Sequence, residues 1–567
     1  MQKPLPKFED WPYRVPNIQR VVDKIASFTK AMNEAKDEKE ALKVWKSHAK
    51  YQDGVTNDII HISVLFSLDS LNPRYEKDND KMDEGMPLIQ NEENKFVKAT
   101  VNSPFRPFLE KKLGSHLFKM YDYTLRSFDE CIIEEAVEEN KLCSEYGKTI
   151  ASIQIEFRGE TYNMPQMGRF TQDLDRKTRK EASEALYGKL ETIAPTLEDI
   201  YDRLVKVRDK MAKKLGYESY IPLGYLRMSR YDYDAKDVAS YREAIRTSVT
   251  PLVAKLTKEQ FKRTKIRRPE IYDLSLMFVD GNPLPKGSTQ DKVEAAKKMY
   301  DSLSEETSYW FRFMDEHHLL DLEARKGKQS GGYMTDFPKY RVPFIFSNFN
   351  GTSGDVDVLT HEFGQSFQYC MARNIAIPEY RMPTMESAEI DSMSMEFFAE
   401  PYMDLFFDEP LKYRYDHLAS SISFLPYGVT VDEYQHFVYE HPNATKEERN
   451  AYWHELEEKY TPYKVALYGN NEFLKAGRRW LIQGHIFSSP FYYIDYTLAQ
   501  VMAFEFFNLD RKNHALAWKR YIKLLKMGGK YPFRSLVTKC GMKDPFQEGV
   551  IKKTIAPLMK QLKSYGI

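Results

Sequence analysis

Apolar residues recur at intervals close to 3.6 along most of the chain, with charged residues between them, and this pattern predicts amphipathic helices. The longest such stretches cover residues 21–50, 176–215, 290–321 and 496–527. Segments in which apolar and polar residues alternate, as they do in half-buried strands, are few. We therefore expect a mainly α-helical protein with a small β-sheet.

Two segments predict the β-structure. Residues 151–164 predict a hairpin, because two short strand-like runs flank the turn dipeptide Arg158-Gly159. Residues 341–349 form a longer apolar run with Pro343 near its start. Since proline has no N–H to donate to a neighbouring strand, we expect this run at the edge of a sheet.

The chain of 567 residues is too long for one compact core and predicts several packed units. We expect a helical N-terminal lobe with the hairpin, residues 1–195, and a larger lobe, residues 196–567, that holds the sheet. This boundary lies within a helical pattern, and no linker rich in proline or glycine marks it. Polar stretches predict loops at residues 74–95, 326–332 and 441–450.

Charge and composition exclude several classes of protein. Lysine plus arginine and aspartate plus glutamate both total 83, and this balance argues against a dedicated nucleic-acid binder. The four cysteines include no C-x-x-C pair, which argues against a disulfide framework and a cysteine zinc site. The first residues lack the apolar core of a signal peptide, and no run of about 18 apolar residues predicts a membrane span. We expect a cytoplasmic protein without a membrane or nucleic-acid partner.

The segment 351–368 concentrates candidate catalytic side chains on a predicted buried helix. His361 is followed by Glu362 and, four residues after the histidine, by Gln365. Residues four apart share a helix face, and in the H-E-x-x-H pattern two histidines bind zinc while the glutamate is the general base. A His-Glu pair alone carries little information. His454-Glu455 is a second such pair, which we interpret as a solvated helix face.

Two carboxylates further along the chain strengthen the interpretation. Glu389 and Glu396 are seven residues apart, so on a helix they lie two turns apart on the same face. Apolar residues such as Ile390, Met393 and Phe397 surround them, which is not the pattern of a solvated face. One carboxylate can bind a metal while the other orients a metal ligand from behind.

Three segments together resemble the M3 family of zinc metallopeptidases, the thimet oligopeptidase family. They are His361-Glu362-Phe363-Gly364-Gln365, the E-x-x-S-x-x-x-E pattern from Glu389 to Glu396, and the His/Tyr segment 484–500. The chain looks closest to the branch of oligoendopeptidase F and Pz-peptidase. The resemblance covers residues 200–540 well and the N-terminal third loosely.

The resemblance implies a two-lobed, zincin-like helical metallopeptidase, with a small sheet beside the active-site helix and a deep channel that admits short unstructured peptides. It implies one zinc ion, held by His361, Glu389 and the residue at position 365, with Glu396 behind the ligands. Glu362 would activate the zinc-bound water. The oxyanion would be bound by His485, Tyr493 and Tyr496, and the spacing leaves open which tyrosine reaches it. The free edge of the strand Pro343–Phe349 would bind peptide backbone, with Phe346, Ser347 and Asn348 as contact residues.

Two positions depart from the family pattern. Gln365 stands where the family has its second histidine ligand, and an amide is not among the usual zinc ligands. Asp391 stands where this branch leads us to expect a histidine, close enough to change the charge or hydrogen bonding of the site.

Three interpretations follow from Gln365. The chain binds zinc weakly through His361, Glu389 and waters, it is a pseudopeptidase that keeps the peptide cavity, or Gln365 is a change introduced into an active enzyme. We expect an oligopeptidase that acts on short peptides as a monomer or weak homo-oligomer. The alternative is a peptide-binding protein that hydrolyses poorly.

Overall fold

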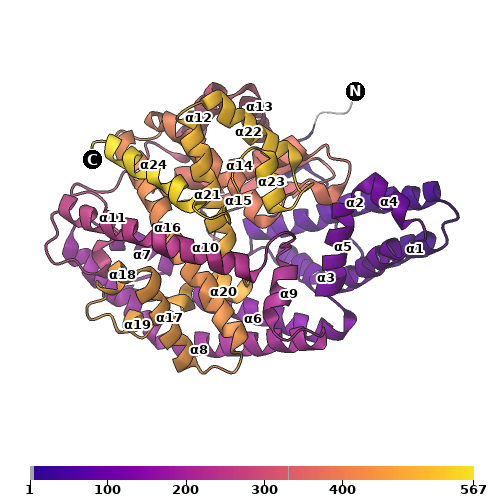
Figure 1. Ribbon diagram of the computed structural model, residues 1–567, viewed down its shortest axis with the longest axis horizontal. Coiled ribbons are helices and arrows are strands. Elements are labelled where there is room, and N and C mark those ends of the chain that lie inside the picture. Colours follow the sequence, from indigo (N-terminus) through magenta and orange to yellow (C-terminus); the bar gives the residue numbers. More distant parts are fainter. Residues whose placement is uncertain (1–4, 330) are drawn as a thin grey trace.

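The computed structural model describes residues 5–329 and 331–567. It is mainly helical, with small sheets, as the sequence predicts (Figure 1). The N-terminal third contains α1 (Ile18–Asn33), α2 (Glu38–Leu68), α3 (Pro73–Val101), α4 (Arg106–Leu113), α5 (Ser115–Ser127), α6 (Ile133–Ala151), α7 (Met164–Thr171) and α8 (Arg176–Lys214).

The middle of the chain contains α9 (Tyr220–Arg227), α10 (Ala235–Ser248), α11 (Thr250–Arg263), α12 (Thr289–Leu303) and α13 (Glu305–Glu316). The C-terminal part contains α14 (Gly354–Ala372), α15 (Met385–Ala399), α16 (Pro410–Glu440), α17 (Lys446–Tyr460), α18 (Pro462–Val465), α19 (Glu472–Lys475), α20 (Gly484–Ser488), α21 (Tyr493–Asp510), α22 (His514–Met527), α23 (Phe533–Lys539) and α24 (Val550–Ser564). The strands are β1 (Ile155–Phe157), β2 (Glu160–Tyr162), β3 (Leu320–Glu323), β4 (Tyr333–Phe337) and β5 (Val342–Phe349).

The prediction of a helix over residues 176–215 is confirmed by α8. The other three long patterns are each broken by a local cap. Residues 21–50 divide into α1 and α2, where the Asp37 carboxylate accepts from the Glu40 N–H at 2.8 Å. Residues 496–527 divide into α21 and α22, where Asn513 caps the second helix. Residues 290–321 divide into α12 and α13 and end in β3.

The loop predicted at residues 74–95 is wrong, because this segment lies inside α3. Asn72 caps the helix, Pro73 occupies its first position, and Met82 and Ile89 are buried among exposed charged residues. The apolar face is narrow, so the polar residues dominate the pattern. The described residues of 326–332 lie between β3 and β4 outside helices and strands. In the stretch 441–450, only the first residues form a loop, because α17 begins at Lys446.

The helices α1 to α5 form an extension on the right of Figure 1 with a hydrophobic core of their own. Ile25, Trp45, Phe96 and Leu117 lie in this core. The much larger second core joins α6 and α8 to the remaining helices and the sheet. The predicted boundary between residues 195 and 196 falls inside the continuous helix α8.

The hairpin is confirmed as the antiparallel pair β1–β2, shorter than predicted, with Arg158 and Gly159 at the turn. The larger sheet has the order β3-β5-β4, with β5 parallel to β3 and antiparallel to β4. The prediction that residues 341–349 form an edge strand is therefore wrong, since β5 is central. Pro343 is accommodated because β3 pairs with β5 only from Ile345 onward.

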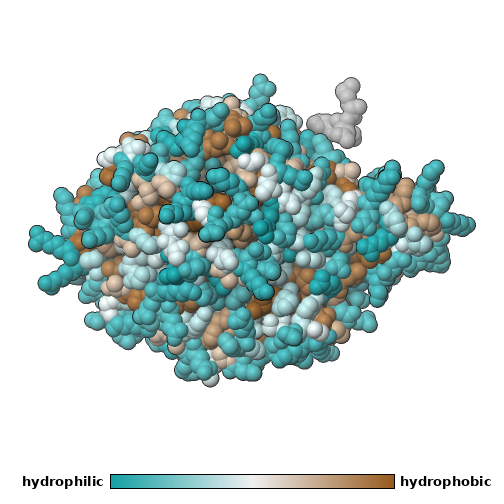
Figure 2. Space-filling view, in the orientation of Figure 1, coloured by the Kyte–Doolittle hydropathy of each residue, from teal (hydrophilic) through white to brown (hydrophobic). Residues whose placement is uncertain are grey.

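Among residues 5–329 and 331–567, no helix combines the length and the apolar character that a membrane span requires. Hydrophilic residues cover most of the face shown in Figure 2, with hydrophobic residues scattered between them. This hydrophilic surface agrees with the composition of the chain, in which charged residues make up 29%.

Candidate functional site

The site is built where α14 and α15 approach each other closely. Gly364 on α14 permits this approach, because a Cβ at this position would lie 2.7 Å from the main-chain oxygen of Asp391 and from Cα of Ser392 on α15. At the start of α14, the Asp355 carboxylate accepts from the N–H groups of Asn350 and Gly351, at 2.8 and 2.9 Å. The tight turn after β5 thus directs α14 back along the sheet.

His361 on α14 lies between two carboxylates of α15. Its Nδ1 is 2.7 Å from Oε1 of Glu396, and its Nε2 is 3.2 Å from Oε2 of Glu389. Burial lowers the pKa of His361, but hydrogen bonds and charges of the two glutamates outweigh burial and raise it well above its ordinary value. The Glu396 contact fixes the imidazole so that Nε2 faces Glu389.

Glu389 is the point on which the other side chains converge. Its Oε1 accepts from the Tyr492 hydroxyl at 2.6 Å, and its Oε2 lies 3.2 Å from Oγ of Ser392. The Gln365 amide nitrogen lies 3.4 Å from the same Oε2. Glu389 is 3% exposed, whereas His361 and Gln365 are partly exposed. The three side chains form one cluster, as the spacing predicts.

Behind His361, Glu396 joins a second histidine that the sequence analysis missed. Its Oε2 is 2.7 Å from Nε2 of His417 on α16. Burial raises the pKa of Glu396, but its two histidine partners outweigh burial and lower it to about 2. For His417, burial lowers the pKa and the hydrogen bond and charge of Glu396 raise it to about 9. The sequence offers one signal for His417. It follows Tyr413 by four residues and so shares with it a largely buried face of the long helix α16.

Glu362 faces the outer strand β4. Burial raises its pKa to about 7, and the charge of His361 and then the main chain of Met334 on β4 oppose that rise. In the described part of the sheet, β4 pairs with β5 on one side only. The free edge beside the candidate base therefore belongs to β4, not to the predicted strand.

The three predicted contact residues on β5 lie in the centre of the sheet. Phe346 is fully buried and its ring stacks on Tyr333 of β4, with centroids 4.8 Å apart. The main-chain oxygen of Ser347 accepts a hydrogen bond from Lys328. The Asn348 amide donates to the carbonyls of Gln329 and Gly331, both at 2.8 Å. These side chains hold the loop between β3 and β4 and leave β5 no free edge for a peptide, so the prediction of backbone binding at this strand is wrong.

The His/Tyr segment 484–500 lies beside the same cluster. His485 Nε2 is 3.3 Å from the Tyr496 hydroxyl, and its Nδ1 is 3.0 Å from the Gln483 amide nitrogen. The Gln483 amide oxygen accepts from the Tyr427 hydroxyl at 2.7 Å, which orients the amide with its nitrogen toward His485. Nδ1 is then an acceptor and Nε2 carries the proton.

The two candidate tyrosines have different surroundings. Burial raises the pKa of Tyr496, and the charge of Glu389 adds to the increase. Burial also raises the pKa of Tyr493, with Tyr427 as the next contributor, and its ring is 5.7 Å from that of Phe424. Tyr496 thus faces the carboxylate cluster, while Tyr493 faces α16. Tyr492, which the sequence analysis does not single out within the segment 484–500, contacts Glu389 directly.

Asp391 lies on α15 close to Glu389, whose charge acts on its carboxylate. Its main-chain oxygen accepts from the Tyr521 hydroxyl of α22 at 2.6 Å. Its carboxylate is buried, Oδ1 has no hydrogen-bond partner in the described chain, and burial raises its pKa well above the ordinary value. It makes no hydrogen bond to His361, Gln365 or Glu389 among the described residues.

The residues present offer a metal ion an unusual donor set. No group of three or more His, Cys, Asp or Glu side chains suited to a metal occurs among the described residues. What converges is one imidazole nitrogen, one carboxylate and one amide, from His361, Glu389 and Gln365. The first two are ordinary zinc ligands, and their orienting partners Glu396 and Tyr492 are in place.

Two sequence profiles match the chain. The profile of Peptidase family M3 matches residues 169–554, more than half of the chain, and that of the Peptidase M3 N-terminal domain matches residues 8–128. The chain belongs to peptidase family M3. No curated protein sequence matches it.

Solved structures of M3 peptidases share the whole fold. A structure described as Pz peptidase A with inhibitor 2 is 41% identical with a TM-score of 0.94, covering 98% of this chain and 99% of the other. An oligoendopeptidase F described as putative is 40% identical with a TM-score of 0.95, covering 99% and 100%. A second such protein, from Bacillus anthracis, is 41% identical with a TM-score of 0.90 and 98% coverage of both chains. These relatives support the predicted branch of oligoendopeptidase F and Pz-peptidase within family M3.

Proposed function

We propose that this M3 peptidase is a zinc-dependent oligoendopeptidase that hydrolyses short unstructured peptides. The single observation that supports it most is the arrangement of Glu362 between the cluster of His361 and Glu389 and the free edge of β4. A carboxylate suited to act as a base, two side chains able to bind a metal and a free strand edge therefore lie close together. Family membership supports peptide hydrolysis as the reaction.

His361 Nε2 and the Glu389 carboxylate would hold the zinc ion, with the Gln365 amide oxygen as a third, weaker donor after rotation of the amide. Glu396 and Tyr492 would orient the two strong ligands. When bound, zinc supplies a positive charge that polarises the scissile carbonyl and acidifies water.

The chain's own residues would act in sequence around that group. The main chain of β4 would pair with an extended peptide. Glu362, whose pKa of about 7 suits a base near neutral pH, would accept a proton from the attacking water and transfer it to the leaving amine. Tyr496 O–H and His485 Nε2–H would donate hydrogen bonds to the developing oxyanion.

A second function is supported by Gln365. Its amide nitrogen, rather than its oxygen, lies 3.4 Å from Glu389, and an amide is a neutral, weak donor. A chain that loses zinc at this position would keep the β4 edge and the tyrosines and bind peptides without cleaving them.

Hydrolysis of a quenched fluorogenic peptide in zinc-containing buffer distinguishes the two. The peptidase proposal predicts cleavage by the natural chain and a loss of about 10²–10⁴-fold for Glu362→Gln. It also predicts faster cleavage by Gln365→His, which adds a strong ligand. Peptide binding without cleavage by both the natural chain and Gln365→His would support the second function and overturn the first.

A further inference from the structure

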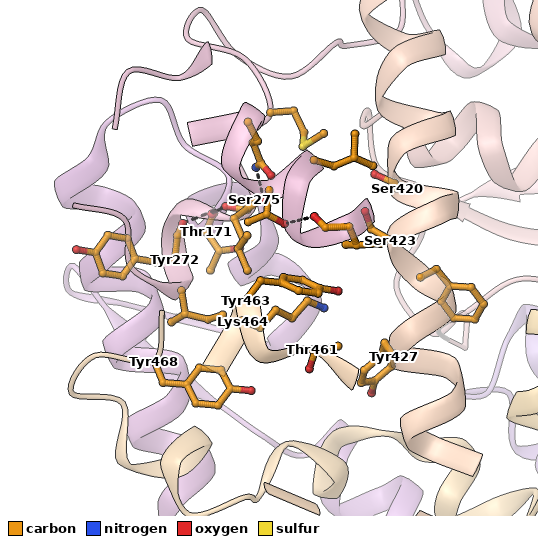
Figure 3. A pocket seen from close by; sticks show the side chains of 18 of the residues that line it. Thr171, Tyr272, Ser275, Ser420, Ser423, Tyr427, Thr461, Tyr463, Lys464 and Tyr468 are labelled. Atoms are coloured by element: carbon orange, nitrogen blue, oxygen red, sulfur yellow. Dashed lines mark hydrogen bonds between the residues drawn. The ribbon is translucent and has the colours of Figure 1, made fainter. Parts of the chain in front are cut away.

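A cavity of about 550 Å³ lies beside the candidate site, between α8, α11, α16 and the segment of residues 461–479 (Figure 3). In Figure 3, Tyr463 and Lys464 of α18 extend across it toward Ser420 and Ser423 of α16. Its volume is within the range of small-molecule sites, ~300–1,000 Å³. Several side chains with hydroxyl groups also line the cavity, including Thr171, Ser275, Thr461 and Tyr468.

Three cationic side chains line the cavity without an ion pair among the described residues. The Lys464 ammonium and the Arg479 guanidinium make no hydrogen bond to the described chain, and Nη1 of Arg479 is buried. Arg263 donates to the Met277 carbonyl at 2.8 Å and to the Tyr415 hydroxyl at 3.0 Å, and its Nη2 is buried without a partner. All three residues are partly exposed as a whole, so the groups that lack a partner are the two buried arginine nitrogens. Buried nitrogens in proteins normally have a hydrogen-bond partner.

The nearby acids do not balance these cations. Glu457 accepts from the Tyr468 hydroxyl at 2.7 Å through Oε1, and its Oε2 is buried without a partner. Burial raises the pKa of Glu457 to about 7 and that of Asp416, on the neighbouring turn of α16, above its ordinary value. Burial, and then the charge of Arg479, lower the pKa of Lys464 to about 8. Glu457 is thus the chain's own acid in this cavity, and its charge acts on both Lys464 and Arg479. It forms no ion pair with either among the described residues, so both cations remain open to an added anion.

A tyrosine connects the cavity to the candidate catalytic residues. The Tyr427 ring centroid lies 5.5 Å from the Lys464 ammonium and 5.4 Å from Cζ of Arg479. Its hydroxyl donates to Gln483, which in turn contacts His485. On its other side, the ring is 5.8 Å from that of Tyr493. An occupant of the cavity would therefore be separated from His485 by Tyr427 and Gln483, and from Tyr493 by the Tyr427 ring.

We propose that Lys464 and Arg479 bind a carboxylate of the peptide substrate in this cavity, a proposal that rests on the proposed peptidase function. The carboxylate would fit between the two cations, with hydroxyls of Tyr463 and Ser423 nearby. The C-terminal carboxylate of a short peptide and the side chain of an acidic residue have the same chemistry. Recognition of the C-terminal carboxylate would select short peptides, and recognition of a side chain would select acidic ones. In both cases the contact would fix which peptide bond lies at the candidate site.

The test measures binding rather than cleavage, so that it is independent of turnover. Three peptides labelled with fluorescein at the N-terminus are titrated by anisotropy, with Glu362→Gln introduced into the natural chain and into every variant so that the peptides are not cleaved. The first has a free C-terminus and no acidic residue, the second is its C-terminal amide, and the third is that amide with glutamate as its last residue. We expect the amide to bind about 10- to 100-fold more weakly than the free acid, as a lost charge-assisted hydrogen bond predicts. If the third peptide regains the affinity, the acidic side chain is a second source.

Variants assign the effect to the two cations. Lys464→Met and Arg479→Gln are expected to remove the preference for the free acid, and Lys464→Arg to retain it. The matched control is Lys475→Met, at a half-exposed position on the neighbouring helix α19. Equal affinities of the natural chain for all three peptides would overturn this inference alone. Absence of binding by every peptide would overturn the proposed function as well. Circular dichroism checks that each variant is folded.

Discussion

The carboxylate of Glu396 lies 2.7 Å from Nδ1 of His361 and holds the imidazole with its Nε2 toward Glu389. Its second oxygen is 2.7 Å from His417, so α14, α15 and α16 meet at this one carboxylate. A metal ligand that is oriented by a carboxylate gains basicity and loses rotational freedom. Glu396 is therefore a positioning residue for the candidate metal ligand.

Replacement of this carboxylate should weaken the site without abolishing it. Glu396→Gln is expected to lower zinc affinity by about 10–100-fold, because the imidazole loses its charged partner. Zinc titration with a competing chelator measures the affinity. His417→Gln, which leaves the contact between Glu396 and His361 in place, should have the smaller effect. Equal zinc affinities for the natural chain and Glu396→Gln would contradict the positioning role.

The two tyrosines of α21 should differ in their effect on cleavage. The Tyr496 hydroxyl lies 3.3 Å from Nε2 of His485, and the charge of Glu389 contributes to its raised pKa, whereas Tyr493 faces α16. Tyr496→Phe is therefore expected to lower kcat by about 10²–10³-fold, as removal of an oxyanion donor does. Tyr493→Phe should change kcat by less than that. Steady-state kinetics on one peptide measure both, and a larger loss for Tyr493→Phe would reverse the assignment.

The close approach of α14 and α15 should be sensitive to one methyl group. Gly364→Ala places a Cβ 2.7 Å from main-chain atoms of α15, which cannot move without separating the helices. We expect a loss of about 1–3 kcal/mol or more in the free energy of unfolding. Gly147→Ala on α6 is the control, because nothing lies within 4 Å of its added Cβ. That variant should be as stable as the natural chain or more stable by up to ~1 kcal/mol. Thermal denaturation measures both, and equal midpoints would contradict the packing argument.

A buried ion pair outside the site should make stability depend on pH. Glu139 contacts Arg208 at 2.6 Å and Arg227 at 2.8 Å. Burial raises the pKa of Glu139, but the two arginines outweigh burial and lower it to about 2. The folded pKa is thus below the unfolded value of about 4.3, so the stabilisation is present above pH ~4.3 and is lost as pH falls toward 2.

The matching variant is Glu139→Gln, which leaves the buried Arg208 and the partly exposed Arg227 without their anion. Removal of one partner of a buried pair costs about 3–5 kcal/mol. Urea unfolding at neutral pH should show a loss of that order relative to the natural chain. The difference in the free energy of unfolding between the two proteins should become smaller as pH falls below ~4.3. If this difference in free energy stays constant down to pH 3, protonation of Glu139 does not control the stability of the fold in this range.

The sequence could predict the features that depend on local spacing. His361, Glu362 and Gln365 share one helix, and Glu389 and Glu396 share another, so fixed intervals of four and seven residues place them on common faces. The helix α8 follows from its own periodicity and from its cap Asp175. These relationships need no knowledge of distant contacts.

Features that depend on contacts between distant segments could not be predicted in this way. The central position of β5 depends on β3, whose pairing with Ile345 leaves Pro343 free of that partner. Tyr492 contacts Glu389 across 103 residues of sequence, and His417 contacts Glu396 across 21. The cations Lys464 and Arg479 line one cavity only where α18 packs against α11 and α17. Strand order and such convergence are set by tertiary packing, which no local pattern encodes.

The most direct measurement is the zinc content of the purified natural chain by elemental analysis, after dialysis against metal-free buffer. His361 and Glu389 are expected to retain about one zinc ion per chain, while Gln365→His should retain zinc through harsher chelation and Glu389→Gln should retain none. The retained zinc should accompany cleavage of a short peptide. A natural chain that retains no zinc and cleaves no peptide in zinc-containing buffer would contradict the proposal that these two ligands suffice for a peptidase.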